Sequence, residues 1–401
     1  MRKTGGIWVS AGEISGDMHG ASLCEALRRR APGLRLMGMG GPAMRALDFE
    51  SFFQAEELSV MGFTEVIGHL PRIFRLLSAA KKKLASEKPD ALVVIDSPDF
   101  HFRLLREARR LGIPAYYYIS PKVWAWRQGR AEFIREHVRR LISILPFEAD
   151  FYRRFDLRVD YVGNPLLDQL DLPALDGISP QSGRIGLMPG SRRKEVSRLM
   201  PAFGLAARSL LALRGDLRFA CAVAPGLSED YVRSFWPADL PLACCPPEAR
   251  HVFMRECEIL LAASGTAVLE SALIGTPAII AYMGSPLSFL LARLVVKVSH
   301  VGLPNLIAGR EILPELLQRA AAGPLLAAFA AHWLGLAGTV EIPGNCVRVF
   351  RREVEPKFAE ECGDPRQVRL NLARLRSLLG GPGAAERAAG IILEDLAAES
   401  T

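Results

Sequence analysis

Short apolar runs alternate with longer amphipathic segments along most of the chain, and this pattern predicts an α/β protein. Short apolar runs suit buried strands of a parallel sheet, whereas the amphipathic segments suit helices that cover it. Strand-like runs occur in two series: Gly6–Ser10, Leu34–Met37, Ala91–Ile95, Ala115–Ile119, Leu141–Leu145 and Val159–Val162, then Arg184–Met188, Arg218–Val223, Ile259–Ala263 and Ala278–Tyr282. Strands and helices that alternate in this way predict two doubly wound sheets with a cleft between them.

The boundary between the two series is marked by composition. Gly163-Asn164-Pro165 reads as a hinge, and residues 166–183 are rich in Asp, Pro and Gly. We therefore expect an N-terminal domain over residues 1–165, a C-terminal domain over 166–375 and a final helix over 376–401.

The stretch Leu260–Pro277, LLAASGTAVLESALIGTP, combines a buried strand, a tight turn and a helix. A strand that turns on glycine into a helix presents free backbone N–H groups, which bind an anion such as a diphosphate. Glu270 lies one turn after Thr266, where it could reach a sugar hydroxyl beside that diphosphate. The alternative is that Glu270 is only a favourable charge near a helix N-terminus.

Polar residues follow three strands of the first series. The run Ala91–Ile95 ends in Asp96-Ser97-Pro98-Asp99, and later runs end in Ser120–Arg127 and Pro146-Phe147-Glu148. Ligands of open parallel sheets bind beyond the carboxyl ends of the strands. Asp96 therefore lies in a functional position, but Asp99 is equally close, and one of the two carboxylates could simply cap the next helix.

Charge and cysteine content narrow the class of protein. The formal charge is +7, and Lys and Arg are spread along the chain, which argues against a nucleic-acid partner and fits an anionic small substrate or an anionic membrane surface. Seven cysteines at irregular spacing form no C-x-x-C pair, which indicates reduced thiols in a cytosol and no structural metal. We find no signal peptide and no uninterrupted apolar run of membrane-spanning length, so we expect a soluble or membrane-peripheral protein.

Residues 59–83 form an unusual segment. They place Ile73, Phe74, Leu76 and Leu77 beside Arg72, Arg75 and Lys81–Lys83. This composition suits an interfacial amphipathic helix, and also an ordinary surface helix over a core.

Eight motifs in order resemble the lipid-A-disaccharide synthase family of bacterial glycosyltransferases. They are SAGEISGDMHGA, VMGFTEVIG, IDSPDF, SPKVWAWRQGR, LPFE, PGSRRKEV, SGTAVLE and LPNLIAGRE, between about residues 7 and 318. The resemblance implies a GT-B architecture, in which two Rossmann-like domains face each other across a cleft. It also implies a metal-free inverting transfer of 2,3-diacylglucosamine from UDP-2,3-diacylglucosamine to 2,3-diacylglucosamine 1-phosphate (lipid X), without a cofactor.

The resemblance assigns roles to particular residues. A transfer of this kind needs a base for the acceptor hydroxyl and positive charge or N–H groups for the departing diphosphate. We expect the catalytic residues to be Asp96 or Asp99, Arg192 and Asn305; Arg192 is preferred over Arg193 by its register in the motif. The expected UDP-binding residues are Gly190, Ser191, Arg192, Ser264, Gly265, Thr266, Glu270 and Asn305. The expected acceptor and membrane side comprises Ser15, Gly16, Asp17, Met61, Phe74, Leu77 and Trp124. Trp124 and Trp126 could instead be core or dimer-contact residues, and His19 is a weaker candidate for proton transfer.

The family also implies partners and a location. We expect a peripheral protein on the inner face of the cytoplasmic membrane and a homodimer with exchanged C-terminal segments. The chain departs from the family at Asn164, where histidine is common, and at Met283, where arginine often follows the tyrosine. Residues 320–362 match nothing in the family and predict an insertion.

Two other functions fit parts of the sequence. One is another GT-B enzyme, such as a UDP-GlcNAc transferase acting on peptidoglycan precursors or a UDP-sugar 2-epimerase, but SPKVWAWRQGR and LPNLIAGRE favour the lipid A enzyme. The other is a non-catalytic membrane-surface protein, against which Asp96 and the turn at 264–266 argue.

Overall fold

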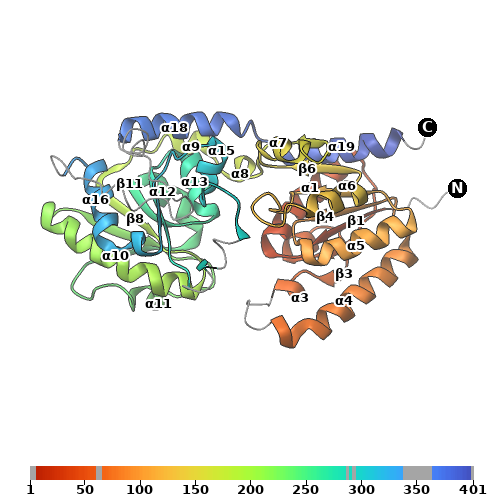
Figure 1. Cartoon of the computed structure of the whole chain (residues 1–401), viewed down its shortest axis with the longest axis horizontal. Coiled ribbons are helices and arrows are strands. Elements are labelled where there is room, and N and C mark those ends of the chain that lie inside the picture. The colour runs from red at the N-terminus through yellow and green to blue at the C-terminus, as the bar shows by residue number, and fades with distance from the viewer. Residues whose placement is uncertain (1–5, 60–65, 286–288, 291–294, 337–363, 399–401) are drawn as a thin grey trace. The chain divides into compact units, whose positions relative to one another are not determined.

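The computed structural model describes residues 6–59, 66–285, 289–290, 295–336 and 364–398. The chain divides into two compact units (Figure 1). The first unit contains residues 1–168 and 381–401, and the second contains residues 169–380. The end of the chain therefore returns to the first unit.

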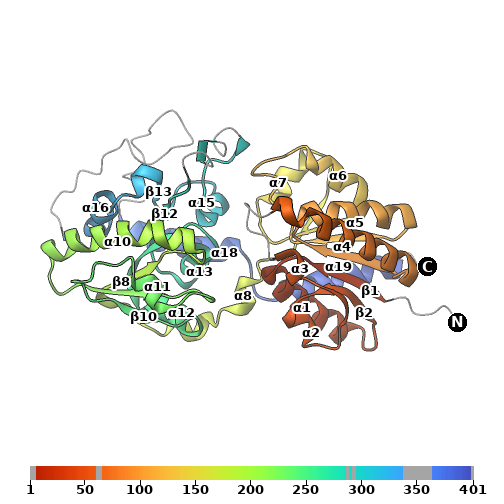
Figure 2. The same ribbon diagram turned by 90° about the horizontal axis from the view of Figure 1, so that it is seen from below.

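The first unit is built on a parallel sheet with strand order β3-β2-β1-β4-β5-β6-β7. Helices flank this sheet (Figure 2). The strands are β1 (Ile7–Ala11), β2 (Leu36–Gly40), β3 (Glu50–Gln54), β4 (Ala91–Ile95), β5 (Ala115–Tyr118), β6 (Arg140–Ser143) and β7 (Val159–Tyr161). The helices are α1 (Ile14–Arg30), α2 (Pro42–Arg45), α3 (Glu56–Ser59), α4 (Val66–Glu87), α5 (Pro98–Leu111), α6 (Arg130–His137), α7 (Glu148–Arg153), α8 (Leu166–Gln169, at the boundary) and α19 (Ala384–Ala398).

Alternation along the strands separates two layers of core. Val93 and Ile95 of β4 belong to one buried cluster together with Leu27 of α1 and Ile392 of α19. The intervening strand positions point to the opposite face, where α5 contacts β4 and β5 and packs against α4. The C-terminal helix thus completes the core of the first unit.

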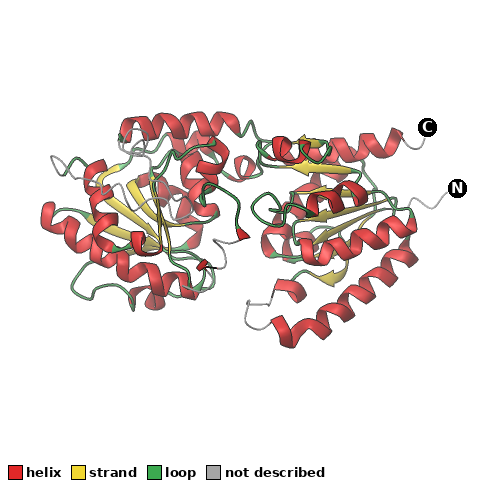
Figure 3. Cartoon of the chain, viewed as in Figure 1, coloured by secondary structure: helices red, strands yellow, loops and turns green. Residues whose placement is uncertain are grey.

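The second unit repeats the plan of strands flanked by helices (Figure 3). Its strand order is β10-β9-β8-β11-β12-β13. Its strands are β8 (Gln181–Met188), β9 (Arg218–Ala222), β10 (Ala243–Cys245), β11 (Cys257–Ala263), β12 (Ala278–Tyr282) and β13 (Glu315–Leu317). Its helices are α9 (Leu172–Asp176), α10 (Arg193–Leu213), α11 (Glu229–Arg233), η1 (Pro247–Ala249), α12 (Arg250–Glu256), α13 (Thr266–Ile274), α15 (Leu303–Ala308), η2 (Gln318–Ala321), α16 (Gly323–Trp333) and α18 (Pro365–Leu378).

Each sheet has one point where the direction of strand addition reverses. In the first unit this switch point lies between β1 and β4, which pair through Ala11 and Ile95. In the second it lies between β8 and β11, which pair through Met188 and Ala262. Loops at the carboxyl ends of such strand pairs form the ligand sites of doubly wound sheets.

The predicted fold class is confirmed, and each predicted strand is present with its ends shifted by at most a few residues. Three short strands were missed, namely β3, β10 and β13. The start of the expected insertion at 320–362 forms α16, a buried helix that packs against α10, and the insertion itself stays a prediction. Residues 337–362 lie outside the described part of the chain.

One described helix, α10, is long and apolar enough to cross a membrane by length and composition alone. Half of its apolar window is buried inside the second unit, where Phe203 and Leu210 are fully enclosed. The core helix of a folded domain passes the same test, so α10 is weak evidence for a membrane span.

Candidate active site

Asp96 lies directly after β4, at the switch point of the first sheet. Asp96 and Ser97 both have left-handed backbone conformations, with φ of 48° and 44°. Such conformations are uncommon outside glycine and gather at functional sites. Burial raises the pKa of the Asp96 carboxyl, while the charge of Lys122 and the N–H of Ser97 act in the opposite direction. A partly buried carboxylate with a raised pKa is suited to accept a proton.

Asp99 has a different environment, in the first turn of α5. Its side chain is 73% exposed and is paired with Arg130 at 2.6 Å and with Arg127 at 3.5 Å. Because the Asp99 carboxylate already forms ion pairs with two guanidinium groups, Asp96 is favoured as the base.

The loop between β1 and α1 lies beside Ser97. A side chain at Gly12 would overlap the Ser97 hydroxyl, which is buried and without a hydrogen-bond partner among the described residues. Ser15 is exposed at the start of α1, and Gly16 is buried close to Ile95. Gly16 therefore lies beside the end of β4, just before the Asp96 loop, and Ser15 is the exposed residue next to it.

Asp17 and His19 are less accessible. Asp17 is buried, and its carboxylate accepts from the backbone N–H groups of Gly41, Ala43 and Met44 at 2.7–3.1 Å, so it caps α2 rather than facing a substrate. Burial lowers the pKa of His19 to about 4, and its Nδ1 has no hydrogen-bond partner among the described residues. His19 is therefore neutral near pH 7.

Trp124, expected on the acceptor side or in the core, is buried. Its indole N–H donates to Glu148 at 2.9 Å, and Ser143 also donates to that carboxylate. Both Trp124 and Glu148 are buried. Two of the sequence motifs, SPKVWAW and LPFE, thus come together to tie the loop after β5 to the loop after β6.

The predicted acceptor-side segment forms α4 from Val66 onward. Phe74 is 52% exposed, with the guanidinium of Arg103 over its ring at 5.3 Å. Leu77 and Leu76 are buried, which corrects the expectation that Leu77 faces the membrane. Met61 lies outside the described residues.

The turn Ser264–Thr266 follows β11 at the switch point of the second sheet. Gly265 and Thr266 are exposed, and Thr266 begins the nine-residue helix α13. The backbone N–H groups of Gly265, Thr266 and Ala267 have no hydrogen-bond acceptor among the described residues. They are the unsatisfied donors that a helix N-terminus offers to an anion.

Glu270 is almost fully buried one turn into α13, beside Arg250 and His251. Its carboxylate lies 3.2 Å from Arg250 and 3.4 Å from His251, both from the start of α12. Burial alone would raise the pKa of Glu270, but His251 and Arg250 outweigh it and lower the pKa. Sequence reasoning missed Arg250 and His251 because nothing in their local pattern links them to Glu270.

The turn Gly190-Ser191-Arg192 follows β8, the strand next to β11, but two of its backbone N–H groups already donate hydrogen bonds within the fold. Glu195 accepts from the N–H groups of Ser191 and Arg192 at 3.1 and 3.2 Å and so caps α10. Gly190 has a φ of 102°, and a side chain there would overlap Glu195. Arg192 is paired with Glu195 at 2.8 Å but is 81% exposed, so its guanidinium remains accessible.

Asn305 is fully buried in α15 and uses both ends of its amide within the fold. Its Nδ2 donates to the Leu313 carbonyl and to Glu315, and its Oδ1 accepts from the N–H groups of Ile312 and Leu313, all at 2.8–2.9 Å. This network makes Asn305 a scaffold residue, contrary to the expected contact with UDP.

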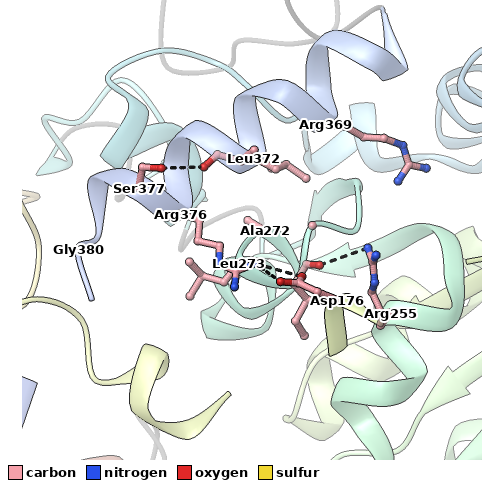
Figure 4. Close-up of a pocket in the computed structure, with 12 residues that line it drawn as sticks. Asp176, Arg255, Ala272, Leu273, Arg369, Leu372, Arg376, Ser377 and Gly380 are labelled. Atoms are coloured by element: carbon pink, nitrogen blue, oxygen red, sulfur yellow. Dashed lines mark hydrogen bonds and ion pairs between the residues drawn. The ribbon is translucent and has the colours of Figure 1, made fainter. Parts of the chain in front are cut away.

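A cavity of about 420 Å³ lies elsewhere in the second unit (Figure 4). It lies at the C-terminal end of α13, away from the turn at 264–266, and is lined by α9, α12 and α18. Arg255 donates to the Leu175 carbonyl and Arg376 pairs with Asp176, so these cations are used within the fold. The candidate site is therefore not this cavity. Among the described residues, no cluster of His, Cys, Asp or Glu has the arrangement of a metal site.

Known proteins resemble the chain in sequence and in fold. The profile of the family described as lipid-A-disaccharide synthetase matches residues 7–335. The lipid-A-disaccharide synthase of Myxococcus xanthus is 37% identical over 396 residues, which cover 97% of both chains. Among solved structures, Arabidopsis thaliana UGT89C1 in complex with UDP-L-rhamnose has a TM-score of 0.60 at 15% identity and covers 97% of this chain and 98% of its own. Acinetobacter baumannii MurG has a TM-score of 0.58 at 12% identity, with 97% and 99% covered.

Two parallel α/β units, each with its candidate residues at a switch point, place the chain among proteins with a GT-B-like fold. The sequence matches are more specific than the fold. The chain belongs to the lipid-A-disaccharide synthase family, and its activity is that of this enzyme.

Proposed function

We propose that the chain transfers 2,3-diacylglucosamine from UDP-2,3-diacylglucosamine to lipid X with Asp96 as the general base. The 6-hydroxyl oxygen of lipid X attacks C1 of the donor sugar, the bond from C1 to the diphosphate breaks, and the proton moves to Asp96. The products are the β-1,6-linked disaccharide 1-phosphate and UDP. The observation that carries this assignment is the position of Asp96 at a switch point, in a left-handed backbone and with a raised pKa.

The donor would bind to the second unit. The free N–H groups of the turn at 264–266 and the exposed guanidinium of Arg192 suit the diphosphate, because both stabilise the negative charge that grows on the leaving group. Glu270 would accept a hydrogen bond from a ribose hydroxyl, and Arg250 and His251 would fix the orientation of the Glu270 carboxylate. Glu270→Gln keeps the size of the side chain and should weaken UDP binding in calorimetry. Unchanged affinity would remove Glu270 from the donor site.

Turnover with defined substrates tests the proposed reaction. UDP-2,3-diacylglucosamine with lipid X should give UDP and the disaccharide 1-phosphate, whereas UDP-GlcNAc without an acceptor should give no product. Asp99→Asn is the matched control for Asp96→Asn and should retain most of the activity. Activity lost in Asp99→Asn and kept in Asp96→Asn would transfer the role of base to Asp99.

The membrane contact belongs to the same proposal. Both substrates carry acyl chains, and the exposed Phe74, Arg72 and Arg75 of α4 combine an apolar group with positive charge. They would dock on the anionic inner face of the cytoplasmic membrane, where each basic residue contributes roughly 1 kcal/mol. The variant Phe74→Ser with Arg75→Ser should sediment less with phosphatidylglycerol vesicles than wild type, and salt should weaken wild-type binding. Equal sedimentation of both proteins would exclude this face.

A homodimer with exchanged C-terminal segments is also proposed. Within one chain α19 packs against α1, and its Ala388 and Ile392 are fully buried. A second copy could supply the same helix. Light scattering distinguishes the mass of one chain from that of two, and a single-chain mass at assay concentration would reject the exchange.

A further inference from the structure

A fully buried histidine lies behind Asp96. His101, on the first turns of α5, places Nδ1 2.7 Å from the backbone carbonyl oxygen of Asp96 and Nε2 3.0 Å from the Ser10 hydroxyl. The hydroxyl of Tyr117 donates to the same Asp96 carbonyl at 2.7 Å. Two neighbouring elements, α5 and β5, therefore converge on one backbone oxygen at the end of β4, and β1 supports the His101 ring through Ser10.

The protons of this network can be assigned from chemistry. A carbonyl oxygen only accepts, so Nδ1 of His101 must carry the proton that lies on the Asp96 carbonyl. With one proton on the ring, Nε2 is an acceptor, and the Ser10 hydroxyl donates to it. Burial lowers the pKa of His101 to about 4, so the ring stays neutral at the pH of the cytosol and this single tautomer persists.

The bonded carbonyl belongs to the strained part of the backbone. Asp96 and Ser97 are both left-handed, and this pair of residues turns the chain from β4 into α5. Strained conformations of non-glycine residues persist only where the surroundings over-determine them. Two donors on the Asp96 carbonyl are such a constraint, and they fix the direction in which the Asp96 side chain leaves the sheet.

We propose that His101, oriented by Ser10 and assisted by Tyr117, is a positioning residue for the transfer reaction: it clamps the Asp96 backbone so that the carboxylate meets the acceptor hydroxyl. His101 itself touches neither substrate. The proposal rests on the proposed role of Asp96 as the base. It predicts that the clamp affects the chemical step and leaves the donor site in the second unit unchanged.

The test compares two substitutions at His101. His101→Ala removes the donor and should lower kcat by about 10²-fold, the loss typical of a reacting group displaced by about 1 Å. His101→Asn retains an N–H close to the position of Nδ1 and should recover kcat to within roughly tenfold of wild type. UDP affinity in calorimetry should be unchanged in both variants. A loss in His101→Ala that His101→Asn does not rescue, or one accompanied by weaker UDP binding, overturns the clamp.

A double-mutant cycle separates this inference from the proposed function. In the Asp96→Asn background, His101→Ala should cause little further loss, because the clamp acts through the Asp96 carboxylate. Full activity in Asp96→Asn rejects the proposed base. An inactive Asp96→Asn together with a fully active His101→Ala rejects only the clamp. If His101→Ala does not fold, Tyr117→Phe removes one donor to the same carbonyl without opening a large cavity. It must then lower kcat with unchanged UDP affinity, and wild-type kcat in Tyr117→Phe rejects the clamp.

Discussion

Glu148 should make the stability of the protein depend on pH in a direction unusual for a carboxylate. Burial raises its pKa from 4.5 to about 7, although the hydrogen bonds from Ser143 and Trp124 act in the opposite direction. The folded state therefore binds one more proton than the unfolded state between these pH values. The contribution of Glu148 to the free energy of unfolding is therefore fully present below pH 4.5 and is lost as the pH rises through about 7.

The size of this effect follows from the shift. One pKa unit corresponds to about 1.4 kcal/mol, so a shift of this size makes the free energy of unfolding about 3 kcal/mol lower at pH 8 than at pH 4. Glu148→Gln removes the titration and keeps the shape of the side chain. The free energy of unfolding of the variant, measured relative to wild type, should therefore rise by about 3 kcal/mol between pH 4 and pH 8.

Thermal and urea unfolding of both proteins across this pH range provide the measurement. Differences between the two proteins are used because other groups titrate equally in both. Asp150→Asn is the matched control, since Asp150 lies on the same helix but is 73% exposed. A difference between Glu148→Gln and wild type that is independent of pH would refute the reasoning and imply that Glu148 is ionised in the folded state.

Two further predictions concern Asp96 and Asn305. Lys122→Met removes the charge that lowers the pKa of Asp96, so the acidic limb of the pH profile of kcat/KM should move to higher pH. The control Lys194→Met, in the second unit, should leave the profile unchanged. An acidic limb that does not move in Lys122→Met would show that Asp96 does not control it. Asn305→Ala leaves the N–H groups of Ile312 and Leu313 without an acceptor, at a cost of about 1–3 kcal/mol for each buried group, so its melting temperature should fall. Wild-type melting together with lost UDP binding would instead make Asn305 a ligand contact.

The strands that could be predicted from the sequence are those with an unambiguous apolar pattern. Ala91–Ile95 and Ala278–Tyr282 have the predicted bounds because each is a continuous apolar run between clear turn residues. The missed strand Glu50–Gln54 is partly exposed and starts and ends with polar residues, so it lacks that signal. The other two missed strands, β10 and β13, have only three residues each.

The features of the candidate site that could not be predicted from the sequence were missed for a different reason. The positions of Asp96 and of the turn at 264–266 follow from local pattern, because the end of a strand can be read from nearby residues. The partners of Trp124 and Asn305 come from other elements, and burial of a polar side chain depends on those partners. The sequence therefore indicated where the loops lie but not which of their polar residues face inward.

The role of Asp96 is tested most directly by measuring turnover and UDP affinity on the same preparation of Asp96→Asn. Loss of a general base typically lowers the rate by about 10²–10⁴-fold. We predict a loss of this size in kcat, with the UDP dissociation constant unchanged, because the base and the donor site lie on different units. A variant that retains near wild-type kcat with UDP-2,3-diacylglucosamine and lipid X would contradict the assignment of Asp96 as the base.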